Sequence, residues 1–281
     1  MATQMQIART IDELRRLRRP LSGPVGLVPT MGYLHQGHLS LVRRAKEESS
    51  SVVVSIYVNQ TQFGAGEDFD SYPRDLDRDL ALLEKEGTDI VFVPSDDEMY
   101  PANFDSWVEV ESLTRRLEGA SRPGHFRGVA TVCAKMFNIV QPDRAYFGQK
   151  DAQQALVLKR MAADLNMNLD LVVAPTVRES DGLAVSSRNT YLNAEERRAG
   201  VVLFGALSLA RELWRGGEKD ADTLRGRMTA LIGKEPLAQI DYVSIADAAT
   251  LEELERIDRP ALASLAVRIG RARLIDNVPL E

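Results

Sequence analysis

The feature that most constrains the fold of this chain is a series of short apolar runs separated by helical patterns. Residues 25–28, 51–58 and 89–93 are apolar or β-branched, as expected of strands that are buried on both faces. Between the second and third runs, Leu76, Leu80 and Leu83 recur at helical spacing. Strands that alternate with helices build βαβ units, so the sequence predicts an α/β fold with a parallel sheet.

The same periodicities predict the next elements along the chain. The helix through Leu76 is expected to open at Tyr72 and Pro73 and to close at Gly87. Residues 122–128 are interpreted as a loop that enters a helix with a buried stripe, and a further helix should bury a second apolar face. The two faces consist of Val129, Val132, Cys133, Met136 and Val140, and of Ala155, Leu158, Ala162 and Leu165. Short strands are expected at 107–110, 145–147 and 170–173.

The length of the chain favours two domains. It has 281 residues, which is long for one compact unit. Beyond about residue 190 the pattern changes to a long helix through Leu203 and Leu207, a second helix near 220–234, and alternating segments at 239–245 and 265–269. This order is typical of a small α+β domain. We therefore expect domains over 1–187 and 188–281, joined near residues 185–190.

Charge and cysteine content narrow the class of protein. The net charge of −6 disfavours a nucleic-acid binder that depends on bulk positive charge. A single cysteine, Cys133, excludes an internal disulfide and a thiolate-rich metal site, which fits a reducing cytoplasm. No apolar run approaches the roughly 20 residues of a membrane span. The basic segment near Arg15 is predicted to be a short helix rather than a targeting peptide, because Thr10 and Glu13 form a capping box and Pro20 follows.

The stretch 29–38, PTMGYLHQGH, is the first candidate site. It follows an apolar strand and precedes a helix, so free backbone N–H groups and the positive end of the helix dipole meet there. Two of the three histidines, His35 and His38, add side-chain donors, and Gly37 allows a ligand to approach the backbone closely. The histidine spacing also fits a metal pair on a helix. Since no third ligand of matching type stands nearby, phosphate binding is favoured over zinc.

Three other polar segments follow predicted strands. Residues 148–151 place Lys150 and Asp151 at the carboxyl end of a strand, where open α/β sheets bind ligands, although Asp151 also suits a helix N-cap and Lys150 a solvated surface. Residues 185–188 offer two hydroxyls and a guanidinium that suit outer phosphates, or an interdomain linker. Gln62 and Gln154 suit a substrate that carries a carboxylate and hydroxyls. Neither a P-loop nor a G-x-G-x-x-G fingerprint is present.

The motifs PTMGYLHQGH, VNQTQFG, YPRD, RPGHFRGV, YFGQKDAQQ and TVRESDGLAVSSRN, in this order over residues 24–192, resemble the pantothenate synthetase (pantoate–β-alanine ligase) family. The resemblance implies a Rossmann-like, nucleotidyltransferase-type N-terminal domain with a smaller C-terminal lid, usually paired as a homodimer. It also implies a ligase that converts ATP, (R)-pantoate and β-alanine to pantothenate, AMP and diphosphate through pantoyl-adenylate. Mg²⁺ would bridge the phosphates and be held chiefly by the nucleotide.

The resemblance also implies roles for individual residues. His38, His35 and Lys150 would be catalytic, Gln62 and Gln154 would bind pantoate, and Gln62 would also bind β-alanine. The ATP site would consist of Met31, Gly32, Tyr33, Leu34, His35, Gln36, Gly37, His38, Gly148, Gln149, Lys150, Asp151, Val177, Val185, Ser186, Ser187 and Arg188. No residue is assigned as the base for the β-alanine amine, and none is named as a protein ligand of Mg²⁺.

Two departures from the family pattern concern loop geometry. Gln60 stands where the family often has proline, and Gln149 where it often has glutamate. The rival functions are another nucleotidyltransferase, such as a phosphopantetheine adenylyltransferase, and a nucleotide-binding regulatory module without catalysis. The first is expected to be shorter and to lack the C-terminal extension, and the second would not need the paired glutamines or both histidines. Length and acidity disfavour an aminoacyl-tRNA synthetase.

Overall fold

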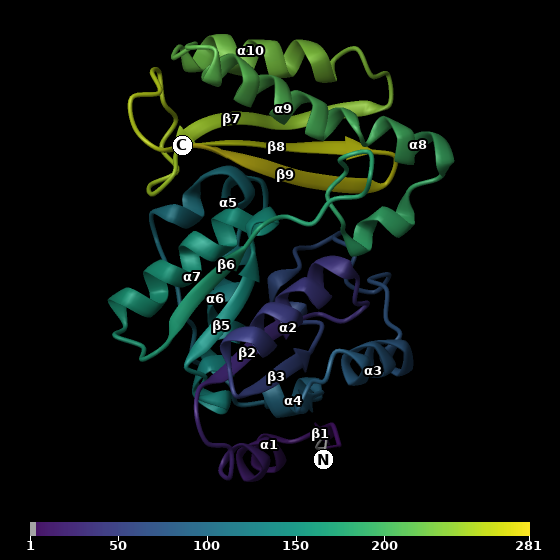
Figure 1. The fold of residues 1–281 in the computed structure, drawn as a ribbon, viewed down its shortest axis with the longest axis vertical. Coiled ribbons are helices and arrows are strands. Elements are labelled where there is room, and N and C mark those ends of the chain that lie inside the picture. The colour runs from purple at the N-terminus through teal and green to yellow at the C-terminus, as the bar shows by residue number, and fades with distance from the viewer. Residues whose placement is uncertain (1–3) are drawn as a thin grey trace.

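The computed structural model describes residues 4–281 and shows a larger N-terminal part below a smaller C-terminal one (Figure 1). The N-terminal part is built on a six-stranded sheet in the order β1-β4-β3-β2-β5-β6, in which every neighbouring pair is parallel. Its strands are β1 (Gln6–Ala8), β2 (Val25–Thr30), β3 (Ser51–Ile56), β4 (Ile90–Phe92), β5 (Arg144–Gly148) and β6 (Asp170–Ala174). The predicted α/β class with a parallel sheet is confirmed.

Helices cover both faces of this sheet because its central strands are apolar on both sides. Leu27 and Val53 belong to one core, together with α1 (Ile11–Arg18), α6 (His125–Val140) and α7 (Ala152–Asp164). Val28 and Val54 belong to the other core, with α2 (Gln36–Glu48) and α3 (Leu76–Lys85). The remaining short helices are α4 (Asp96–Met99), α5 (Leu117–Ser121) and the 3-10 turns η1 (Gln60–Gln62), η2 (Leu113–Arg115) and η3 (Gln149–Asp151). Alternate residues of one strand therefore support opposite layers.

The C-terminal part is an antiparallel sheet with helices on its outer face, as expected of a small α+β unit (Figure 1). Its strands are β7 (Ala238–Asp247), β8 (Ala261–Ile269) and β9 (Ala272–Leu280). Helices α9 (Val202–Arg215) and α10 (Ala221–Ile232) pack on this sheet, and η4 (Ser187–Tyr191) and α8 (Ala194–Ala199) lead into them. The opposite face of the sheet looks toward the carboxyl ends of the parallel strands.

Several predicted boundaries are wrong. No strand forms at 107–110, where the Val108 N–H donates to the Thr131 hydroxyl at 3.0 Å instead of to a neighbouring strand. Helix α3 begins at Leu76 rather than at Tyr72, because the Asp75 carboxylate caps its first turn. Helix α6 begins at His125, inside the segment 122–128 that the sequence pattern predicts to be a loop.

Other differences concern single residues and elements that the sequence pattern concealed. Leu165, expected on a buried face, is 55% exposed just beyond α7. Strand β9 was not predicted, since Asp276 and Asn277 interrupt its apolar pattern, although both are buried. The capping box of Thr10 and Glu13 is confirmed at the start of α1. Every helix within residues 4–281 is too short or too polar to cross a bilayer.

Candidate active site

A cavity of about 730 Å³ lies between the carboxyl ends of the parallel strands and the inner face of the C-terminal sheet. Segments that follow β2, β3, β5 and β6 line it from below, and residues of β8 and β9 line it from above. Strands β2 and β5 are neighbours, and the chain continues from them toward opposite edges of the sheet. Such a reversal of strand order is where open α/β sheets bind their ligands.

The turn after β2 is held in an unusual backbone conformation. Gly32 has φ of 80° and Tyr33 has φ of 47°, so two successive residues are left-handed. The buried carboxylate of Asp79, from α3, accepts hydrogen bonds from the N–H groups of Tyr33 (2.6 Å) and Leu34 (2.7 Å). The Thr30 hydroxyl donates to the Ser55 carbonyl at 2.7 Å and joins the turn to β3. The turn therefore owes its shape to Asp79, which no local sequence signal had singled out.

The two histidines of the turn form one stacked unit. Their ring centroids are 3.9 Å apart and their planes differ by 24°. The backbone N–H of His35 donates to Nδ1 of His38 at 3.3 Å, so Nδ1 of His38 is an acceptor and Nε2 carries the ring proton. A Cβ at Gly37 would lie 2.9 Å from Cε1 of His35, so the glycine makes room for that ring. The Nε2–H group of His38 is therefore a hydrogen-bond donor with a fixed direction.

Burial keeps both histidines neutral. It lowers the pKa of His35 to about 4, with the positive charge of Lys150 as the next cause. It also lowers the pKa of His38 well below its usual value, helped by His35 and Lys150. At neutral pH both rings are therefore uncharged. Among residues 4–281 no group of three or more histidine, cysteine or carboxylate side chains is arranged to hold a metal ion.

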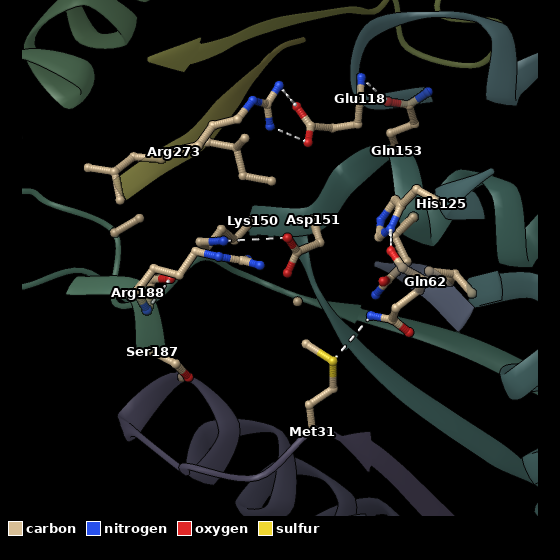
Figure 2. A pocket seen from close by; sticks show the side chains of 18 of the residues that line it. Met31, Gln62, Glu118, His125, Lys150, Asp151, Gln153, Ser187, Arg188 and Arg273 are labelled. Carbon is tan, nitrogen blue, oxygen red and sulfur yellow. Dashed lines mark hydrogen bonds and ion pairs between the residues drawn. The ribbon is translucent and has the colours of Figure 1, made fainter. Parts of the chain in front are cut away.

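The turn after β5 brings Lys150 and Asp151 to the cavity (Figure 2). Asp151 occupies the N-cap position of α7, but its carboxylate makes no capping hydrogen bond to that helix. It pairs instead with Nζ of Lys150 at 3.4 Å. Both side chains are consequently available to a ligand, whereas the neighbouring Gln149 donates to Asn277 of β9 at 2.9 Å.

Residues 185–188 also reach the cavity, and Arg188 already has a partner. Its guanidinium donates two hydrogen bonds to Asp68, at 2.9 and 2.8 Å. Burial opposes ionisation of Asp68, but the hydrogen bonds and charge of Arg188 outweigh it, and the pKa of that carboxyl is lowered. The Ser187 hydroxyl donates to the Tyr33 carbonyl at 3.3 Å and joins this segment to the histidine turn.

The two glutamines line the same cavity beside an apolar floor. Gln62 is oriented by Asn59, whose amide donates to its Oε1 at 3.0 Å, and its own Nε2 lies 3.2 Å from the sulfur of Met31 (Figure 2). Gln154 projects from the first turn of α7. The floor is made of Phe126, Val129, Val132, Cys133, Met136 and Phe147. Burial raises the pKa of the Cys133 thiol to about 12, so this residue acts as an apolar wall rather than as a nucleophile.

Most of the residues predicted for the site are brought together by the fold. Those that line the cavity are Met31, His35, Gly37, His38, Gln62, Gly148, Lys150, Asp151, Gln154, Val177, Val185, Ser186, Ser187 and Arg188. Five others do not: Gly32 and Leu34 are buried in the turn, Tyr33 stacks under Arg78, Gln36 accepts from Arg43, and Gln149 faces β9. The backbone of 32–34 still shapes the turn.

The carboxylates that face the cavity cations were not predicted from the sequence. Arg122 is paired with Glu67, Arg188 with Asp68, and Arg273 with Glu118, at closest distances of 2.6, 2.8 and 2.6 Å. The Glu118 pair joins α5 to β9 and so links the two parts of the molecule, as Figure 2 shows. The partners are 55, 120 and 155 residues apart, and no local spacing signals such pairs.

Comparisons with known proteins identify the relatives of this chain. The sequence profile of the family described as pantoate-β-alanine ligase matches residues 6–279. The pantothenate synthetase of Roseiflexus castenholzii is 61% identical over 277 residues, covering 99% of this chain and 100% of its own. That of Herpetosiphon aurantiacus is 58% identical over 275 residues, covering 98% and 99%.

Solved structures agree in both fold and extent. The pantothenate synthetase of Thermus thermophilus superposes with a TM-score of 0.93 at 48% identity, covering 98% of this chain and 99% of that one. A pantoate-β-alanine ligase of Francisella tularensis, complexed with β,γ ATP and β-alanine, superposes with a TM-score of 0.80 at 33% identity, covering 98% and 97%. The resemblance seen in the sequence motifs is thereby confirmed over the whole chain.

Proposed function

This chain belongs to the pantoate–β-alanine ligase family, and from that premise we propose how its residues carry out the reaction. The enzyme is a ligase that uses ATP to join pantoate to β-alanine as pantothenate. The observation that carries the residue assignment is the meeting of three groups around one cavity: the histidine turn, the cations Lys150 and Arg188, and the amides Gln62 and Gln154.

The proposed first step forms pantoyl-adenylate. A carboxylate oxygen of pantoate attacks the α-phosphorus of ATP, the bond to the β-phosphate oxygen breaks, and diphosphate leaves with the electron pair. In the second step the β-alanine amine attacks the acyl carbon, AMP leaves, and the amine loses a proton. Negative charge builds on the phosphate oxygens in the first step, so donors fixed around them lower its barrier.

His38 is the donor we assign to the phosphate under attack. Its Nδ1 is occupied by the N–H of His35, which leaves Nε2–H to point at a ligand. The stacked ring of His35 holds that orientation, and the nearby Lys150 supplies positive charge. Because an imidazolium could not accept at Nδ1, His38 donates to the phosphate as a neutral imidazole. His38, His35 and Lys150 are the proposed catalytic residues.

The outer phosphates are assigned to Ser186, Ser187 and Arg188. Because Asp68 holds the Arg188 guanidinium in the structure, a phosphate that binds there must displace or share that carboxylate. Val177 and Val185 complete the nucleotide side of the cavity. The turn backbone at Met31, Gly32, Tyr33, Leu34, Gln36 and Gly37, together with Gly148, Gln149 and Asp151, forms the rest of the proposed ATP site.

Pantoate and β-alanine are assigned to the side of the cavity that carries the two glutamines. Pantoate lies against Gln62 and Gln154, with its apolar groups on the floor around Val132 and Met136, and Gln62 also binds β-alanine. An amide both donates and accepts, which suits a molecule that carries a carboxylate and hydroxyls. The Met31 and Asn59 contacts leave the Gln62 amide little freedom, so binding orders few side-chain rotations.

Mg²⁺ fits this site as a partner of the nucleotide. Glu67, Asp68 and Glu118 are each tied to an arginine, and Asp276, which also lines the cavity, is tied to Arg178. Asp151, by contrast, is paired with Lys150 at 3.4 Å and with no arginine among residues 4–281. The ion would therefore be held by the phosphates, where it neutralises charge, with Asp151 as the carboxylate free to contribute.

We propose that the C-terminal part closes on the site as a lid. The boundary between 1–187 and 188–281 falls within the segment assigned to phosphate, so ATP binding couples directly to domain position. Equal domain separation in solution scattering with and without ATP would argue against closure.

A cytoplasmic homodimer is also proposed. Trp107, 40% exposed beside Tyr100 and Phe104, offers apolar surface to a partner. Light scattering that gives the mass of one chain would exclude the dimer.

One measurement tests the proposed chemistry. Purified protein should release AMP and diphosphate from ATP only when pantoate is present, and should make pantothenate once β-alanine is added. Transfer of ¹⁸O from the pantoate carboxylate to AMP identifies the acyl-adenylate route. Release of ADP, turnover without pantoate, or ATP binding without turnover would refute it.

A further inference from the structure

His125 is the one histidine that the proposed reaction leaves without a task. It is the first residue of α6 and lies at the wall of the cavity, against the turn that carries Gln62 (Figure 2). Its Nδ1 is 2.8 Å from the Gln62 carbonyl oxygen, and its Nε2 is 3.0 Å from Nη1 of Arg122. Both ring nitrogens are thus within hydrogen-bonding distance of fixed groups.

The chemistry of these neighbours fixes the tautomer. A guanidinium only donates, so Nε2 of His125 must be the acceptor, and a carbonyl only accepts, so Nδ1 must carry the proton. Burial and the adjacent Arg122 charge lower the pKa of His125 to about 4, and they outweigh the hydrogen bond to the Gln62 carbonyl and the charges of Glu67 and Glu118, which raise it. The ring is therefore neutral at working pH, and its direction of donation is defined.

Arg122 is itself held in place. Its Nε and Nη2 donate to the two carboxylate oxygens of Glu67 at 2.7 and 2.6 Å, a bidentate pair whose side chains are 15% and 24% exposed. The chain of contacts runs from Glu67 through Arg122 and His125 to the Gln62 carbonyl. In each of these hydrogen bonds, the chemistry of the two groups fixes which one donates and which one accepts.

The first turn of α6 is pressed against the same segment. A Cβ at Gly128 would collide with the carbonyl oxygen of Thr61, so only glycine permits this approach. The Gly128 carbonyl accepts from the Asn59 amide at 3.3 Å, and Asn59 also orients the Gln62 side chain. The Gln62 carbonyl also accepts a longer hydrogen bond from Nη2 of Arg122, at 3.4 Å, so Gln62 is fixed at its backbone chiefly by His125 and at its amide by Asn59.

We propose that His125 is a positioning residue for catalysis: its neutral imidazole accepts from Arg122, donates through Nδ1 to the Gln62 carbonyl, and thereby sets the Gln62 amide for pantoate and β-alanine. The inference rests on the proposed role of Gln62. These hydrogen bonds also make His125 unsuitable as the base for the β-alanine amine, because neither ring nitrogen has a free lone pair to take the proton.

Two substitutions, each of which keeps the position of one ring nitrogen, separate this role from simple packing. In His125→Asn the amide nitrogen takes the place of Nδ1 and keeps the donor to Gln62. In His125→Gln the amide lies where Nε2 was, so it keeps the acceptor for Arg122 and loses the donor to Gln62. We expect the Asn variant to stay within about threefold of wild type in kcat/KM for pantoate and β-alanine, and the Gln variant to lose on the order of tenfold to a hundredfold, the scale of a small misplacement of a reacting group. KM for ATP should change less than about twofold in both, since neither substitution touches the proposed phosphate contacts.

A double-substitution cycle tests whether His125 acts through Gln62. Gln62→Ala alone should reduce kcat/KM for both acids, and adding His125→Gln should cost little more. If Gln62→Ala has no effect, the proposed substrate role of Gln62 fails, whatever His125 does. If Gln62→Ala has its effect but the Asn and Gln variants behave alike, or their effects add fully to it, the positioning role fails.

The tautomer has its own measurement, which does not depend on the function. The imidazole ¹⁵N spectrum of the full-length enzyme should show His125 protonated at Nδ1 and unchanged between about pH 7 and about pH 5.5, well above its lowered pKa. A proton on Nε2, or titration within that range, would overturn the inference. Thermal unfolding of each variant identifies any that fails to fold, and the spectrum of the wild-type protein still decides the geometry.

Discussion

Substitution of Asp79 by asparagine tests how the histidine turn is held. The Asp79 side chain is 1% exposed and its two oxygens accept from two backbone N–H groups, those of Tyr33 and Leu34, at 2.6 and 2.7 Å. Asparagine keeps the shape but replaces one oxygen by an NH₂ group, which faces a backbone donor and cannot accept. The variant loses one charge-assisted hydrogen bond and the ion pair with Arg78 at 3.6 Å, and it buries an unsatisfied N–H.

The size of the effect follows from these contacts. A hydrogen bond to a charged group contributes about 1.5–3 kcal/mol to stability. Because burial raises the pKa of Asp79, removing the charge also relieves a desolvation cost, so we expect a loss of about 2 kcal/mol, near the lower end of that range. For a domain of this size the melting temperature should fall by roughly 4–8 °C.

The same substitution should weaken ATP binding, because the turn carries both of the histidines that we propose to be catalytic. We expect the Kd for ATP to rise about tenfold, which corresponds to a loss of roughly 1.4 kcal/mol of binding free energy. Calorimetric unfolding and titration with a non-hydrolysable ATP analogue measure the two effects. Asp77→Asn, at an exposed position in the first turn of the same helix, is the matched control. If Asp79→Asn melts within about 1 °C of wild type, or if the control shows equal losses, the reasoning about the turn is wrong.

Three further predictions concern the cavity and its charges. His38→Ala should slow adenylate formation by about a hundredfold or more in single-turnover experiments, the scale of losing one transition-state donor, and a change confined to the KM for ATP would instead make His38 a uniform binder. Asp68→Asn should lower the KM for ATP severalfold, because it frees the Arg188 guanidinium for phosphate, and an unchanged value would remove Arg188 from the phosphate site. Unfolding free energy should fall as pH drops from about 6.5 toward 4, since the folded-state pKa values of His35 and His125 are lowered to about 4 and the unfolded chain takes up protons first. Each histidine contributes up to about 1.4 kcal/mol per pH unit in that window, so urea titrations of His125→Asn should show a slope shallower by about one proton, and an identical slope would mean that His125 titrates normally in the fold.

The sequence by itself determined the architecture of the sheet. Runs such as 51–58 are too apolar and β-branched to lie anywhere but in a strand covered on both faces, and the structure places β3 at Ser51–Ile56. Parallel strands bring their carboxyl ends to one edge, so the segments after β2, β3 and β5 had to meet, and with them His38, Gln62 and Lys150. Periodicity and strand direction are local properties, and they can be read from one segment at a time.

The same local signals were misleading where a distant partner decided the outcome. Residues 107–110 alternate like a strand, yet Val108 donates to a hydroxyl of α6 and no strand forms. Strand β9 shows the opposite case, a strand that forms without an apolar pattern. Its buried Asp276 interrupts that pattern, and the ion pair with Arg178, 98 residues away, compensates the buried charge. In both cases a hydrogen bond across the fold outweighed the intrinsic preference of the segment.

Only the tertiary structure decided which charges and donors face one another in the site. Asp79 shapes the histidine turn from 46 residues away, Asp68 holds Arg188 from 120, and His125 meets Gln62 from 63. These pairs leave no trace in residue spacing, since a side chain is paired by its position in space and not by its place in the chain. The sequence thus determined where the site lies and which residue types converge there, and the packing of loops and helices around the sheet determined how each of them is oriented and charged.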